Sequence, residues 1–135
     1  MLVVRLPEGA ELVRVPLQTD GQFALRYRNS LYGSLVEERF ALGAEGRIEL
    51  VEIAADELAV LEEYYSIDEP ARPAPSDEAR RWIAQPANPV SVGELMVAAT
   101  DLGERTLIVD SQPPIELWRL VDDGAASVIL ELEAR

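Results

Sequence analysis

The sequence predicts a mainly β protein, an antiparallel β-sandwich or partly closed barrel of about eight to ten strands with one or two short helices. Turn-forming residues recur about every eight to twelve residues, which is the spacing typical of such folds. Between the turns, apolar and polar side chains alternate. In the run 22–29, for example, Phe23, Leu25 and Tyr27 share one face and Arg26 lies on the other. This alternation indicates antiparallel strands with one face in the core and one in water.

The alternating runs define the expected strands, and turn signals separate them. Strands are expected near residues 2–6, 11–18, 22–29, 35–42, 46–53, 92–100, 104–110, 114–120 and 126–133. Asp20-Gly21 is the best hairpin signal, because a type I′ turn needs positive φ at both central positions, and it lies between the second and third runs. Gly, Pro and Asp residues indicate further turns at 43–46, 101–103, 112–114 and 122–124.

Residues 54–65 fit two structures. Most of them are strong helix formers, and one face of a helix would be shared by Ala54, Leu58, Leu61 and Tyr65. Leu58, Val60 and Tyr64 also fit a strand, which Glu62 would interrupt. Helix and strand therefore both stay open for this segment.

The Pro-rich passage 70–89 holds five of the nine prolines and breaks the strand pattern. Within it, residues 76–83 predict a short helix, because Ser76 can cap the free amides, acids follow at the positive end and arginines come later. We expect a single β-rich domain over 1–135. The Pro-rich segment of about 68–90 would connect its two halves, since neither half could bury a core alone.

The composition excludes several classes of function. The chain has no His, Cys or Lys, so it lacks a Ser-His-Asp or Cys-His nucleophile, thiolate or imidazole zinc ligands, and a redox disulfide. Its 25 acidic and 12 basic residues give a net charge of −13, which argues against binding to nucleic acid or to anionic membranes. We expect no metal and no cofactor, and any acid–base chemistry would fall to Glu, Asp or Tyr.

The hydropathy pattern bears on the compartment. No segment approaches the ~18 uninterrupted apolar residues of a spanning helix, so no membrane span is expected. The first seven residues form too short an apolar run for a signal peptide. As written, the chain is expected in the cytoplasm, whereas an export signal removed ahead of Met1 would place it outside.

Glu38 is the most informative single residue. In the expected strand 35–42 it shares a face with Val36, Phe40 and Leu42. A carboxylate on a core face must find a partner or take up a proton, because an isolated buried charge is costly. Glu38 is therefore either a ligand-contacting carboxylate in a pocket or part of a structural ion pair, a capping bond or a solvated strand end.

Two residues in the turn before this strand, Asn29 and Ser30, are candidate partners for Glu38. Asn29, Ser30 and Glu38 together form the candidate ligand-binding site, placed where they would converge. No catalytic residue is assigned.

Two charged segments are further candidates. The range 45–70 holds nine acids against one base, Arg47: Glu45, Glu49, Glu52, Asp56, Glu57, Glu62, Glu63, Asp68 and Glu69. Such a run could dock a basic partner or hold calcium, and a solvated face explains the same charge. Arg80, Arg81 and Trp82 could clamp an anion or a planar ligand, or they could simply end a helix and anchor its loop.

The first long hairpin, within residues 23–40, resembles an uncharacterised family of small bacterial and archaeal proteins. Members carry a domain of unknown function and are often encoded beside TRAP-type solute transporters of the TAXI class. Their hallmark is an aromatic strand ending in His-Ser-Val, then a Val-x-Glu-x-aromatic strand and a hairpin into a Leu-rich strand. Ser30 matches the family Ser, and Val36, Glu38 and Phe40 match the second strand.

The resemblance extends into the C-terminal half, where 95–107, Leu117 and 128–132 look like the closing strands of the family. Asn29 stands in place of the family His, so any role of that imidazole is absent here. The resemblance implies a β-rich fold, an exported or membrane-tethered setting and a transporter neighbourhood, but no known activity.

Three functions are consistent with these observations. The leading expectation is a non-catalytic accessory or binding module linked to solute transport, with a transporter component or a small solute as its partner. The alternatives are a small-molecule-binding β-barrel and a carboxylate-dependent enzyme that uses Glu38. An accessory module needs an exposed patch or strand edge, a ligand barrel needs an apolar cavity, and an enzyme needs a second polar group near Glu38.

Overall fold

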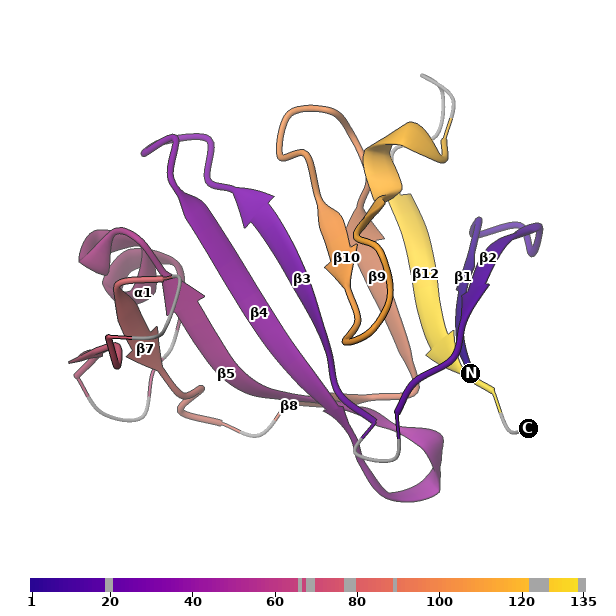
Figure 1. The fold of residues 1–135 in the computed structure, drawn as a ribbon, viewed down its shortest axis with the longest axis horizontal. Coiled ribbons are helices and arrows are strands. Elements are labelled where there is room, and N and C mark those ends of the chain that lie inside the picture. The colour runs from indigo at the N-terminus through magenta and orange to yellow at the C-terminus, as the bar shows by residue number, and fades with distance from the viewer. Residues whose placement is uncertain are drawn as a thin grey trace.

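Two antiparallel sheets make up the fold in the computed structural model of the chain (Figure 1). The structure describes residues 1–18, 21–65, 67, 70–76, 80–88, 90–121 and 127–133. The smaller sheet contains β2 (Glu11–Val15), β1 (Leu2–Arg5), β12 (Ser127–Leu132) and β9 (Glu94–Ala98), in that order. Strands from the two ends of the sequence therefore pair at its centre, with Leu2 opposite Leu132.

The larger sheet has seven strands in one path and an eighth that pairs beside β7 on β5. The path is β11 (Ile115–Glu116), β10 (Thr106–Ile108), β3 (Phe23–Arg28), β4 (Leu35–Leu42), β5 (Ile48–Ala55), β7 (Trp82–Ala84) and β6 (Arg72–Pro73). The eighth strand, β8 (Val90–Val92), pairs with the first half of β5. The chain then crosses at Gly93 from the larger sheet into β9 of the smaller one.

One face of the larger sheet is covered in two parts. Over β3 and β10 the smaller sheet packs against it, and the first core cluster, which includes Leu2, Val128, Leu25 and Leu107, fills the space between the sheets. Beyond the smaller sheet, the short helix α1 (Leu58–Tyr64) covers the other part. The second core cluster lies beneath this helix and contains Val36, Ile53, Ala55, Val60, Leu61 and Ala84. Figure 1 shows α1 and the smaller sheet at opposite ends of the larger one.

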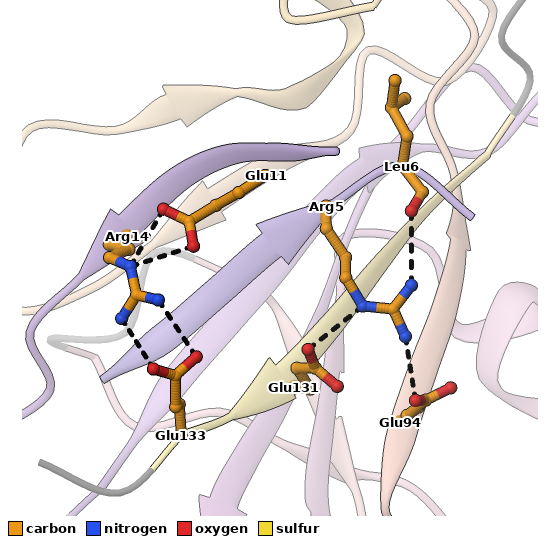
Figure 2. A network of polar contacts seen from close by, with 7 residues as sticks. All are labelled: Arg5, Leu6, Glu11, Arg14, Glu94, Glu131 and Glu133. Carbon is orange, nitrogen blue, oxygen red and sulfur yellow. Dashed lines mark hydrogen bonds and ion pairs between the residues drawn. The ribbon is translucent and has the colours of Figure 1, made fainter. Parts of the chain in front are cut away.

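Charged residues cover the outer face of the smaller sheet (Figure 2). Arg5 on β1 reaches Glu131 at 3.0 Å and Glu94 at 2.8 Å, so one guanidinium links three neighbouring strands. Arg14 on β2 similarly bridges Glu11 and Glu133, at 2.9 and 3.0 Å. Cross-strand pairs of opposite charge stabilise a sheet modestly and help to fix its register.

The predicted fold class is confirmed as a β-sandwich, and the sheets do not close into a barrel in the part of the chain that the structure describes. Twelve strands occur there, more than the expected eight to ten. The additional strands β6, β7 and β8 are only two or three residues long; β6 and β7 lie in the Pro-rich passage and β8 directly follows it. That passage therefore contributes strands to the larger sheet in addition to connecting the two halves of the chain.

The hairpin predicted at Asp20-Gly21 does not form, because the strands on either side of it do not pair with each other. Gly21 has the positive φ of a turn, 64°, while Asp20 lies outside the described residues. However, β2 pairs only with β1, and β3 pairs with β4 and β10, so the two flanking strands belong to different sheets. A local turn signal does not reveal which strand an alternating run will pair with, since the pairing depends on residues far away in the sequence.

The two segments in which a helix was considered have different outcomes. In the segment 54–65, β5 continues to Ala55 and the helix begins only at Leu58, so each of the two open structures is present in part. In 76–83, residues 77–79 lie outside the described part, but Trp82 and Ile83 form β7. Pairing of Ile83 with Ala54 on β5 outweighs the local helical signals.

Four other turn and strand predictions have mixed outcomes. The turns at 43–46 and 101–103 connect β4 to β5 and β9 to β10, as predicted. The strand expected at 114–120 is shorter, because β11 gives way to a 3-10 turn at Leu117–Arg119. The turn expected at 122–124 lies outside the described residues.

Candidate functional site

Glu38 lies on the covered face of the larger sheet, as the alternation predicted. On β4 it is opposite Leu25 of β3 and Ile53 of β5. Leu25 belongs to the first core cluster and Ile53 to the second, so the carboxylate lies at the boundary between the two clusters. The expected apolar companion Leu42 is instead 49% exposed, because it is the last residue of β4 and follows a register shift after Arg39.

The carboxylate of Glu38 has a hydrogen-bonded partner in Tyr65, which follows α1. The Tyr65 hydroxyl donates to Glu38 Oε2 at 3.1 Å, and the Tyr27 hydroxyl lies 2.6 Å from the Tyr65 hydroxyl. Since Tyr65 gives its single proton to Glu38, Tyr27 must be the donor of the second bond. The result is a directed chain of hydrogen bonds from Tyr27 through Tyr65 to Glu38.

Arg105 completes this group, which we call the Glu38 cluster (Glu38, Tyr65, Tyr27 and Arg105). It directly precedes β10, and its guanidinium carbon lies 4.5 Å from the centre of the Tyr27 ring, a cation–π contact. The positive charge favours the ionised form of Glu38 and so acts to lower its pKa. The cluster thus joins residues from β3, β4, the end of α1 and the start of β10.

Burial dominates the electrostatics of the cluster. It raises the pKa of Glu38 above the ordinary value, and the opposing effects of Arg105 and the Tyr65 hydrogen bond are smaller. Burial and the nearby Glu38 charge likewise raise the pKa of Tyr65, and burial raises the pKa of Tyr27. Both hydroxyls therefore keep their protons at physiological pH and act as hydrogen-bond donors.

The raised pKa of Glu38 gives a test in solution. The folded protein binds the Glu38 proton more tightly than the unfolded chain does. Glu38 therefore makes the fold less stable as the pH rises above 4.5, the ordinary pKa of this carboxyl group. Glu38→Gln keeps an acceptor for Tyr65 but does not titrate. We expect the stability of the wild type to decline relative to Glu38→Gln as the pH rises above 4.5, measured by chemical denaturation. A stability difference that is constant with pH would contradict the raised pKa.

Asn29 and Ser30 do not reach Glu38. Asn29 is buried at the end of β3, and its Oδ1 accepts hydrogen bonds from the backbone N–H groups of Leu31 and Tyr32 at 3.0 and 3.1 Å. Glu38 is level with Leu25, four residues before Asn29 and so ~13 Å away along the strand. Ser30 is exposed in the turn itself. Asn29 thus shapes the turn between β3 and β4, and the predicted convergence does not occur.

Sequence reasoning missed Tyr65, Tyr27 and Arg105 as partners of Glu38. Tyr27 was on the correct face in the alternating pattern, and the tight connection between β3 and β4 places it near Glu38. Nothing local placed Tyr65, because its position depends on where α1 packs. Arg105 lies beside Tyr27 only because β10 pairs with β3, a contact between distant parts of the chain.

Several of the other charged candidates are engaged in structural contacts, whereas Arg81, Glu45, Glu57 and Glu62 are exposed. Arg80 forms an ion pair with Asp56 at 3.1 Å, and Trp82 packs against the second core cluster. In the acidic range 45–70, Glu52 pairs with Arg39 at 2.6 Å, while Asp68 and Glu69 lie outside the described residues. Over the described ranges, no group of three or more acidic residues is arranged to hold a metal ion.

No family model, curated protein or solved structure matches this chain. Among the described residues, no helix has the length and apolar character needed to cross a membrane.

Proposed function

We propose that this protein is a non-catalytic accessory module that docks on a partner protein through one end of its larger sheet. Four apolar side chains are exposed there and form what we call the loop-tip surface: Leu31 (67% exposed), Tyr32 (38%), Tyr64 (50%) and Leu102 (80%). They come from the β3–β4 connection, the end of α1 and the β9–β10 connection. Exposed apolar groups gathered from separate segments are typical of interaction sites.

Hydrogen bonds hold the three segments of the loop-tip surface together. The Tyr32 hydroxyl donates to Glu63 of α1 at 2.7 Å. The backbone N–H of Arg28 donates to the carbonyl of Gly103 at 2.8 Å, which places Leu102 beside the end of β3. The side chain of Arg28 also donates to the carbonyl of Gly33 at 2.6 Å. A surface fixed in this way can bind a partner without paying a large ordering entropy.

The charge around the loop-tip surface indicates the chemistry of the partner. Five exposed acids surround it: Glu57, Glu62, Glu63, Asp101 and Glu104. Arg28, an exposed base at this end, is 3.9 Å from Glu104. An apolar centre with an acidic rim complements a segment that carries both apolar and basic side chains. The family resemblance suggests a component of a solute transporter as the protein that carries this segment.

The alternative functions have less support. A ligand-binding barrel needs a hollow interior, but buried apolar side chains of the first core cluster fill the space between the two sheets. An enzyme needs a polar group near Glu38, and Tyr65 supplies one. Two surface hollows in the described part of the chain, however, lie on the opposite face of the sheet, and Glu38 does not line either of them.

Binding of a designed peptide tests the docking proposal. The probe is a fluorescent amphipathic helix of Leu and Lys, compared with a matched helix of Leu and Glu. We expect the basic peptide to bind by fluorescence anisotropy, with an affinity that falls as salt rises, and the acidic peptide not to bind. Leu31→Ser combined with Leu102→Ser should weaken binding at least about tenfold, or about 1.4 kcal/mol.

Met96→Ser is the matched control, since Met96 is 62% exposed on β9 of the smaller sheet. It should leave the affinity for the basic peptide unchanged. Equal losses in the control and the loop-tip variant would place binding elsewhere and refute the proposal.

A further inference from the structure

The uncovered face of the larger sheet carries a hollow of about 400 Å³ over the ends of β3, β10 and β11. Arg26 and Arg28 of β3, Thr106 of β10 and Trp118 of the 3-10 turn are among its lining residues. Its volume is at the lower end of the roughly 300–1,000 Å³ of small-molecule sites, which suits a ligand with a single ring. We call it the Arg26 hollow.

Arg26 lacks a partner within the described part of the chain, although the chain has 25 acidic residues. Directly opposite on β4 is Glu37, but this carboxylate is 2.7 Å from Arg39. Opposite on β10 is Thr106, whose hydroxyl donates to the backbone carbonyl of Glu104. The residues opposite Arg26 on both neighbouring strands therefore already interact with other groups.

The acids of the hollow are also paired with other arginines. Glu116 lies 3.2 Å from Arg119, and Glu104 lies 3.9 Å from Arg28. Arg26 is partly buried, so its charge is screened less by water than a fully exposed one. A partly buried guanidinium with open donors is well suited to bind a carboxylate, because its planar fork can hold both oxygens.

The walls of the hollow suit a flat apolar body. Leu35, Pro114 and Trp118 supply apolar surface next to the guanidinium. The buried indole N–H of Trp118 has no acceptor among the described residues, an unmet donor of a kind that is rare in folded proteins. We propose that the Arg26 hollow binds a small carboxylate with a flat apolar body, such as an aromatic acid, with Arg26 holding the carboxylate and Trp118 contacting the ring.

This inference does not depend on the docking proposal, and it is tested on the isolated protein. The probe is benzoate, and benzamide is the uncharged comparison with the same shape. Two indole N–H signals are expected in ¹H–¹⁵N spectra, from Trp82 and Trp118, and loss of one signal in Trp118→Phe assigns them. We expect benzoate to shift the Trp118 signal in a saturable way up to on the order of 10 mM, which nearly fills a site with a Kd of about 1 mM.

Charge recognition is tested by two variants that remove the same charge. Arg26→Gln should weaken benzoate binding at least about tenfold. Arg81→Gln should leave it unchanged, because Arg81 is exposed and does not line the hollow. The proposal is overturned if the Trp118 signal does not saturate, if benzamide gives the same shift, or if Arg26→Gln binds benzoate as well as the wild type.

Discussion

Leu25→Ala is expected to lower the free energy of unfolding by about 2–5 kcal/mol. The Leu25 side chain is fully buried in the first core cluster, between Leu107 on β10 and Glu38 on β4. Truncation removes apolar contacts and leaves a cavity between the two sheets, which a packed interior closes only in part. The free energy is measured by urea denaturation with linear extrapolation.

Leu102→Ala makes the same chemical change at a surface position. Because Leu102 is 80% exposed, the free energy of unfolding should change by no more than about 0.5 kcal/mol. Equal losses of stability in the two variants would contradict the described packing of the smaller sheet on the larger one.

Tyr65→Phe is expected to cost about 1–3 kcal/mol near neutral pH, because it leaves the partly buried Glu38 carboxylate without its hydroxyl donor. The same change removes the acceptor of the Tyr27 hydroxyl. Tyr64→Phe is a matched control in the adjacent position, where the side chain is half exposed and its hydroxyl has no hydrogen bond to another described residue. Urea denaturation of both variants should show a loss for Tyr65→Phe alone.

A double-mutant cycle separates the hydrogen bond from other effects of the Tyr65 change. In a Glu38→Leu background, the carboxylate that needs the donor is gone. Tyr65→Phe should then cost less than in the wild type, because replacing both partners by apolar groups leaves neither polar group unpaired. Equal costs in the two backgrounds would show that Tyr65 does not act through Glu38.

The sequence was most informative where the structure depends on near neighbours. Alternation placed Glu38, Val36 and Phe40 on one face of β4, because successive side chains in a strand point to opposite sides. The Gly-containing turn at 43–46 correctly joined β4 to β5, and the overall class of β-sandwich followed from many such local signals.

Features that depend on distant pairing could not be predicted in this way. The two- and three-residue strands in and just after the Pro-rich passage have no alternation of their own. β7 and β8 form because β5 offers them a partner, and β6 in turn pairs with β7. Tyr65 meets Glu38 because α1 packs on the second core cluster, a contact that no local pattern encodes. Asn29 was expected to meet Glu38, but its side chain satisfies the N–H groups of its own turn.

The loop-tip surface was also outside the reach of sequence patterns. Leu31 and Leu102 are isolated apolar residues in turns that lie far apart in the sequence. They become one surface only because the β9–β10 connection lies beside the end of β3. The acidic run that sequence analysis noted contributes to this surface through the end of α1, where Glu62 and Glu63 are exposed.

Photo-crosslinking in cells of the source organism tests the docking proposal most directly. A benzophenone side chain replaces Leu102 on the loop-tip surface or, in a control protein, the exposed Met96 of the smaller sheet. We expect a specific crosslinked partner at position 102 and none at 96, with the crosslink in a segment rich in basic and apolar residues. The absence of a product at 102, the same products from both positions, or a crosslink to an acidic segment would contradict it.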